Sequence, residues 1–180
     1  PANGKPIITH SQDMVLGLYY LTILKDPDQE VKGYFYSFQD AISALEAKVI
    51  TAFNDYAFQN AEFAKAFNKR KPTTDHWMDF SIGSSACHIG VTQIQKRNAI
   101  GVELYISDDK ELFKSLSAHQ AEIESVMGIA LEWRELPERK ASRIIVEKEV
   151  KLDDHDAWNE QFDYIMDVCM KMKKAFKKYL

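Results

Sequence analysis

The sequence predicts an α+β fold, with a mainly antiparallel five-stranded sheet packed against three helices in the order α-β-β-β-α-β-β-α, after a β-rich N-terminal leader. The strand of residues 99–106, AIGVELYI, alternates large apolar residues with other residue types, which is typical of a strand with one buried face. From Asp156 onward, apolar side chains recur every three or four residues, which indicates a long amphipathic helix. Short turns between the elements favour antiparallel neighbours.

The leader, from Pro1 to about Gly33, is rich in β-formers and turn residues. A helix is expected to start at Ser37, because Ser37 and Asp40 have the spacing of a capping box. Its apolar stripe continues through a second, turn-separated segment to about Lys69. The stripe consists of Ile42, Leu45, Val49, Phe53, Tyr56, Phe63 and Phe67.

Three strands are then expected at WMDFSIG from Trp77, CHIGVTQI from Cys87 and AIGVELYI from Ala99. A helix should follow, capped by Ser107 and ended by Gly128. Its predicted stripe consists of Leu112, Leu116, His119, Ile123 and Val126. The strands LEWREL and SRIIVEKEV come next, joined by a PERK turn. The last helix should pack along the sheet through Trp158, Phe162, Ile165, Cys169, Met172 and Phe176.

Size and composition limit the possible functions. The 180 residues allow one compact domain and an appendage, and 46% hydrophobic residues can build a core. A net charge of −4 argues against a general nucleic-acid coat but allows a local basic patch. Cys87 and Cys169 are too few for a disulfide framework or a cysteine zinc site, and the apolar runs are shorter than a membrane span. We therefore expect a cytoplasmic protein that does not insert into a membrane.

Catalytic and metal-binding patterns are weak, so we expect no catalytic residue, no metal and no cofactor. Glu149 and Lys151 match the Glu-x-Lys of restriction nucleases, but the neighbouring strand lacks the required Asp, and an exposed charged face explains them better. The adjacent Cys87 and His88 should point to opposite sides of their strand. An enzymatic alternative would need a pocket at His88 together with Glu103 and Tyr105, two residues that share one strand face.

Histidines are not spaced to chelate a metal either. His119 interrupts an apolar stripe, where a core or boundary histidine with one hydrogen-bond partner is the simpler interpretation.

The best candidate ligand-binding segment is WRELPERKASR. It gathers cations beside an aromatic residue around a turn, which suits phosphate contact and base stacking. The candidate residues are Trp133, Arg134, Arg139, Lys140 and Arg143. The alternative, which we prefer, is that Arg134 and Arg143 pair with Glu132, Glu135 and Glu138 to brace the hairpin. A second basic cluster, in MKMKKAFKKYL, is better explained as a solvated helix end.

The opening PANGKPIITHSQDMVLGLYYLT, Pro1 to Thr22, resembles the bacterial RNA polymerase β′ subunit, in the stretch after its catalytic aspartate loop. The resemblance weakens through GYFYSFQDAISALEAKVI. The metal-binding NADFDGD motif of that family is absent from this sequence, so the resemblance transfers no catalytic residue and implies only RNA polymerase subunits as partners.

From about Ala52 onward the chain resembles an uncharacterised prokaryotic domain family that usually follows a restriction-endonuclease-like part. The resemblance is in KPTTDHWMDFSIGSSACHIG, IGVELYISDDKELFKSL and LEWRELPERKASRI. Together the two resemblances imply a β′-like leader, residues 1–50, joined to an α+β domain, residues 51–180. The leading hypothesis is a non-catalytic module that binds DNA, another nucleic acid or a nuclease subunit. The alternative is an RNA polymerase-associated fragment that acts through its leader.

Overall fold

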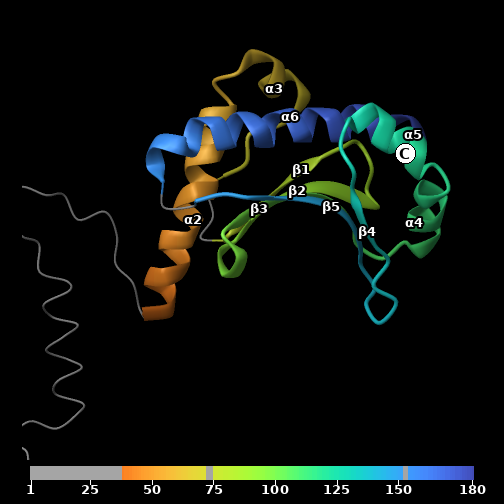
Figure 1. Ribbon diagram of the computed structural model, residues 1–180, viewed down its shortest axis with the longest axis horizontal. Coiled ribbons are helices and arrows are strands. Elements are labelled where there is room, and N and C mark those ends of the chain that lie inside the picture. The colour runs from red at the N-terminus through yellow and green to blue at the C-terminus, as the bar shows by residue number, and fades with distance from the viewer. Residues whose placement is uncertain (1–37, 72–74, 152–153) are drawn as a thin grey trace, which may run out of the picture. The chain divides into compact units, whose positions relative to one another are not determined.

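The computed structural model describes residues 38–71, 75–151 and 154–180, which belong to one compact unit (Figure 1). It confirms the predicted α+β fold. The expected β-rich leader and the Ser37 cap lie outside the described residues. The chain forms α2 (Phe38–Ala57) and α3 (Ala61–Ala66) before the sheet begins.

Five strands make a single, fully antiparallel sheet in the order β1-β2-β3-β5-β4. Their bounds are β1 Trp77–Ser81, β2 Cys87–Ile94, β3 Ala99–Ile106, β4 Glu132–Arg134 and β5 Ser142–Glu149. The register places His88 opposite Tyr105 and Tyr105 opposite Arg143. Three polar residues that are distant in sequence therefore lie in one row across β2, β3 and β5, near one end of these strands.

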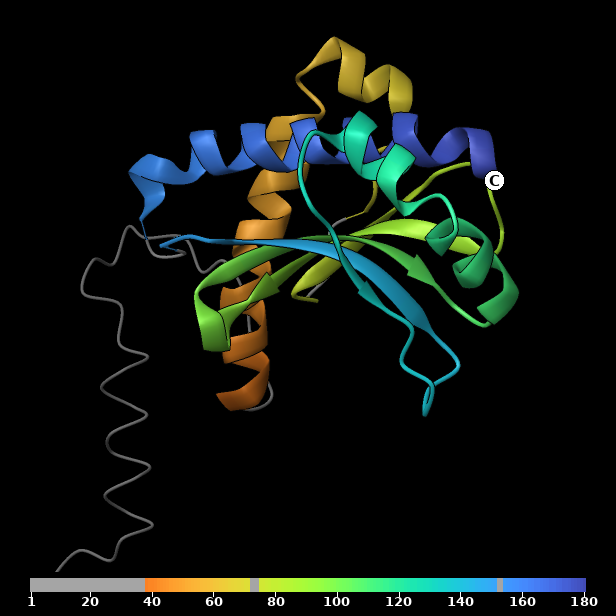
Figure 2. The same ribbon diagram turned by 45° about the vertical axis from the view of Figure 1, so that its right-hand side comes forward.

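Helix α6 (Trp158–Phe176) runs along one face of the sheet, as the two views in Figures 1 and 2 show. The predicted stripe of this helix is confirmed, since Phe162, Ile165 and Phe176 are all at most 3% exposed. Aromatic rings fill the adjacent core: Phe80 packs against Phe63 and Phe67 with ring centroids 5.6 and 5.3 Å apart.

The helical region between β3 and β4 differs from the single helix predicted by the sequence. It divides into α4 (Lys110–Ser117) and α5 (Gln120–Met127), and Asp109 rather than Ser107 caps α4. The break shifts the helical phase, so Met127 is buried while Val126 is 42% exposed. His119, at the break, lies at the surface and stacks on Tyr179 with centroids 4.6 Å apart.

The side chains opposite α6 form what we call the polar face of the sheet. It comprises Trp77, Asp79, His88, Thr92, Glu103, Tyr105, Arg134, Arg143 and Glu147. In both views the loop between β4 and β5 projects to this side, away from α6 (Figures 1 and 2). The loop therefore borders the polar face at one end.

Lys110 holds this loop in place. Its ammonium donates to the carbonyl oxygens of Leu136 at 3.1 Å and Ala141 at 3.0 Å, to Ser142 Oγ at 2.9 Å and to the carbonyl of Glu135. Leu136 has a left-handed backbone conformation, with φ at 52°, that a non-glycine residue adopts only at some cost. One cation thus gathers the carbonyl groups on both sides of the turn.

Candidate functional site

A pocket of about 410 Å³ opens on the polar face. We call it the polar-face pocket, and it is lined by His76, Trp77, His88, Gly90, Val91, Thr92, Glu103, Tyr105 and Arg143. Strand β2 contributes four of these residues and β3 contributes two, while Trp77 comes from β1 and Arg143 from β5. The pocket required by the enzymatic alternative, at His88, Glu103 and Tyr105, is therefore present.

Three side chains stack in series along one side of the polar-face pocket. The rings of His88 and Tyr105 are 5.0 Å apart and inclined by 29°, and the guanidinium carbon of Arg143 lies 5.4 Å from the Tyr105 ring centroid. Burial lowers the pKa of His88, which disfavours the charged form of this imidazole. The series therefore presents flat surfaces rather than a concentrated positive charge.

Glu103 is the one carboxylate among the described residues that line this pocket, and its side chain is only 9% exposed. Arg143 Nη1 lies 3.5 Å from Glu103 Oε2, which is an ion pair without a hydrogen bond. Burial raises the pKa of Glu103, and the nearby charge of Arg143 opposes this rise. Glu103 could exchange a proton, but the lining includes neither a second carboxylate nor a cysteine.

Gly90 makes room for the Glu103 side chain. The two residues are opposite each other in the β2–β3 register, and a Cβ at Gly90 would lie 3.2 Å from Glu103 Cγ. An alanine at this position would require the Glu103 side chain to shift by a few tenths of an ångström. The sequence therefore uses a glycine where the acidic side chain crosses the neighbouring strand.

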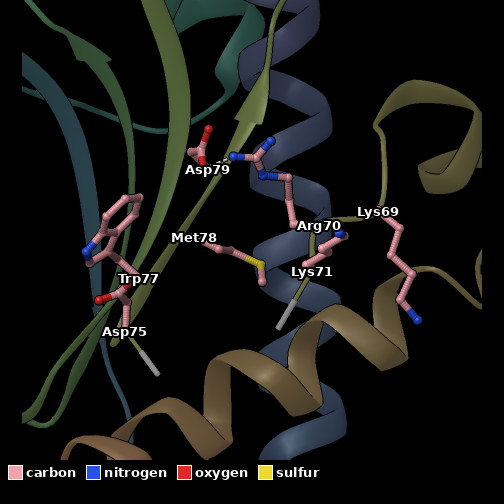
Figure 3. Close-up of a pocket in the computed structure, with 7 residues that line it drawn as sticks. All are labelled: Lys69, Arg70, Lys71, Asp75, Trp77, Met78 and Asp79. Carbon is pink, nitrogen blue, oxygen red and sulfur yellow. Dashed lines mark hydrogen bonds and ion pairs between the residues drawn. The ribbon is translucent and has the colours of Figure 1, made fainter. Parts of the chain in front are cut away.

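A second pocket, of about 450 Å³, lies beside β1 and is shown in Figure 3. We call it the basic groove, and it is lined by Lys69, Arg70, Lys71, Asp75, Trp77, Met78 and Asp79. Figure 3 shows the Arg70 guanidinium reaching Asp79, and the two atoms of this ion pair are 2.8 Å apart. Trp77, which is 45% exposed, lines both pockets.

The five residues predicted from the hairpin do not form one cluster. Trp133 is on the core side of the sheet, where its ring packs near Phe113 and its Nε1 donates to Glu124 at 2.9 Å. Arg134 pairs with Glu132 at 2.5 Å and with Glu147 at 3.1 Å. The predicted pairing with Glu132 is present, but it lies within β4, and the pair that joins β4 to β5 is the one with Glu147.

Arg143 pairs with Glu103 rather than with Glu132, Glu135 or Glu138, which corrects that part of the bracing hypothesis. The register is the reason, because Arg143 lies opposite Tyr105 on β3, beside Glu103 and on the same face. Lys140 is exposed and lies 3.4 Å from Asp108. Among the described residues the guanidinium of Arg139 has no hydrogen-bond or ion-pair partner.

The other predicted groups are placed as follows. Cys87 and Cys169 are both buried and free, and Cys87 faces away from His88. The described residues include no group of three potential metal ligands. Glu149 is exposed near the end of β5.

A family model matches residues 50–180, and its description is "Domain of unknown function (DUF4268)". The chain belongs to the DUF4268 family. The matched range contains both pockets, the β4–β5 loop and every residue of the polar face. The candidate site is therefore a feature of the DUF4268 domain itself.

Shorter similarities connect the chain with RNA polymerase subunits. It is 58% identical over 52 residues to the DNA-directed RNA polymerase subunit beta' of Cyanidium caldarium, which is 28% of this chain and 8% of that protein. It is 55% identical over 47 residues to the subunit gamma of Cyanothece sp., which is 26% of this chain and 8% of that protein. The chain thus spans less than a tenth of the length of these curated relatives. No solved structure matches the chain.

Within the part of the DUF4268 chain that the structure describes, no helix is long and apolar enough to cross a membrane. Sequence reasoning did not single out five residues that line the polar-face pocket, namely His76, Trp77, Gly90, Val91 and Thr92. The available signal was the period of β1, in which Trp77 alternates with the buried Met78 and must therefore face away from the core.

Proposed function

We propose that residues 51–180 form a non-catalytic interaction module of a prokaryotic nucleic-acid-processing system, and that its polar face binds single-stranded nucleic acid. The observation that supports this most is the polar-face pocket, where Trp77 and His88 offer aromatic rings on an antiparallel sheet. Single-stranded bases stack on aromatic platforms of this kind. Base pairs in a duplex would keep the same bases out of reach.

The cations around the polar face support the same proposal, but their ion pairs limit the positive charge that is available for phosphate contacts. Arg70 and Arg143 are paired with carboxylates, so the face is not a strongly positive surface. Arg139 at the bordering loop is exposed and unpaired among the described residues, and it can contact a phosphate. We therefore expect stacking to supply most of the affinity and phosphate contacts to supply a smaller, salt-dependent part.

The test is a fluorescence-anisotropy titration of the full chain with labelled oligothymidine of about 10 nucleotides, a length within the site sizes of single-strand binders. Binding should be retained in part when salt is raised from about 50 to about 200 mM. Trp77→Ala should weaken it by roughly 5- to 150-fold, the usual range for one lost stacking platform. Arg139→Glu should weaken it and reduce its salt dependence.

Tyr164→Ala is the matched control, because Tyr164 is a half-buried aromatic residue on α6, under Lys148 on the other side of the sheet. It should leave binding unchanged. No binding of any single strand by the unaltered chain, or equal losses in Trp77→Ala and Tyr164→Ala, would refute the proposal.

A second candidate function, association with RNA polymerase, is favoured by the similarity to polymerase subunits. The densest part of the resemblance noted in the sequence is Pro1–Thr22, which lies outside the described residues. If this segment acts as the docking element, copurification with bacterial RNA polymerase should disappear when Pro1–Thr22 is deleted. Copurification that survives the deletion would exclude this role.

A further inference from the structure

Glu103 is an acceptor without a donor. Its Oε2 atom is buried and has no hydrogen-bond partner among the described residues, and the nearest cation is 3.5 Å away, on Arg143. A buried polar group in this state is costly, and natural proteins rarely keep one without a purpose. Because Glu103 lines the polar-face pocket, a ligand in that pocket can supply the missing donors.

The shape of the pocket selects a flat ligand. Tyr105 stacks with His88 on one side and with Arg143 on another, and Trp77 lines the same pocket from β1. A volume of about 410 Å³ is at the small end of the range for ligand pockets, so it suits one ring system rather than an extended molecule. A single nucleobase meets both conditions.

The polar groups narrow the choice among bases. An ionised carboxylate only accepts hydrogen bonds, and it has two oxygens, so its best partner offers two neighbouring donors. Guanine has such a pair on its Watson–Crick edge, at N1 and the N2 amino group, and its O6 next to them needs a donor. Arg143 is a donor only and lies beside the carboxylate.

On the same edge, adenine, cytosine and uracil each have one donor, a ring N–H or an amino group, with an acceptor next to it. In any of these bases the lone pair of that acceptor would face the carboxylate and be repelled by it. On the basis of the proposed single-strand binding, we infer that the polar-face pocket is a guanine-reading site, in which Glu103 accepts from N1 and N2, Arg143 donates to O6, and Trp77 stacks on the ring.

The inference is tested by comparing oligothymidines of about 10 nucleotides that carry one central guanine, hypoxanthine or adenine. Hypoxanthine keeps O6 and N1–H but lacks the N2 amino group, so it differs from guanine only in the loss of one of the two donors. The unaltered chain should bind the guanine strand roughly 5- to 150-fold more tightly than the adenine strand, with hypoxanthine between them. This comparison needs no variant and does not depend on how a substitution folds.

Glu103→Gln should abolish the preference, because an amide presents one acceptor and one donor group instead of two acceptors, while plain oligothymidine should still bind. Glu147→Gln is the matched control, since Glu147 is on the same face but does not line the pocket. It should keep the preference.

The outcomes separate the two proposals. Equal affinity for the guanine, hypoxanthine and adenine strands would overturn the guanine site and leave single-strand binding intact. A guanine preference that persists in Glu103→Gln would overturn the role of Glu103. Failure to bind any strand would overturn the proposed function and the guanine site with it.

Discussion

Phe80 is the residue whose loss should damage the core most directly. Its side chain is 1% exposed, and its ring centroid lies 5.3 Å from that of Phe67, 5.6 Å from Phe63 and 6.3 Å from Phe53. Replacing a buried phenylalanine with alanine costs about 3–5 kcal/mol, and more where the surroundings cannot collapse. Because β1 and the facing helices hold these rings in place, we expect Phe80→Ala to lower the free energy of unfolding by about 4 kcal/mol.

Urea unfolding followed by far-ultraviolet circular dichroism measures this loss as a lower midpoint at an unchanged slope. For a chain of this size the same loss corresponds to a melting temperature lower by roughly 8–16 °C. Phe58→Ala is the matched control, because Phe58 contacts the Phe63 and Phe80 rings at 5.4 and 6.2 Å but is only half-buried. It should cost about 1–2 kcal/mol. Equal losses in both variants, or a loss below about 2 kcal/mol for Phe80→Ala, would refute the packing argument.

Three further predictions concern polar interactions. Lys110→Met should cost about 1–3 kcal/mol in urea unfolding, because it leaves loop carbonyls without a donor, whereas the exposed Lys114→Met should change stability by less than about 0.5 kcal/mol. Burial raises the pKa of Glu103, so the folded protein loses stability as pH rises through the interval above the ordinary pKa of a glutamate. Glu103→Gln removes this effect, so its stability relative to the unaltered chain should increase from about pH 4 to 7. A hydrogen bond from Trp133 lowers the pKa of Glu124, so its stabilisation is present above the pKa of an unfolded glutamate and is lost as pH falls through the lower folded value. Glu124→Gln should therefore destabilise the protein at pH 7 and much less below about pH 4, and urea midpoints that show a constant difference across pH would contradict either carboxyl prediction.

Strand and helix positions were predictable where one face is apolar. Val102, Leu104 and Ile106 alternate with smaller or polar residues, and the structure buries all three completely. The α6 stripe was predictable for the same reason. In α6 the local period and the burial agree, so the pattern alone identifies the buried side. In β3 the alternation identifies the apolar face, but Gly101 and Glu103 on the opposite face are buried as well, so the expectation of a single buried face was wrong for this central strand.

The break between α4 and α5 was not predictable in this way. Ala118 and His119 contain neither a glycine nor a proline, and Ala118 keeps a right-handed helical backbone. The apolar residues on either side are consistent with one continuous stripe. Packing against α6 decides the outcome, since it buries Ile123 and Met127 and leaves Val126 outside.

The site was harder to predict than the fold because it depends on register. Glu103, Tyr105 and His88 could be assigned to strand faces from the sequence, but their pairing with Arg143 requires β3 and β5 to be neighbours. Two helices separate these strands in the chain, and local patterns do not reveal which strands meet across such a connection. For the same reason Arg143 was assigned to hairpin bracing instead of the pocket.

Helix α2 has a consequence for how a foreign segment can be attached to this domain. It spans Phe38–Ala57 without interruption, and both Val49 and Ile50 are buried in the core, so residue 50 lies inside a rigid rod rather than in a linker. Adding or removing one residue there would rotate everything upstream by about 100° around the helix axis. A splice at this point is tolerated only if it preserves helical phase, whereas a splice before Phe38 carries no such restriction from α2.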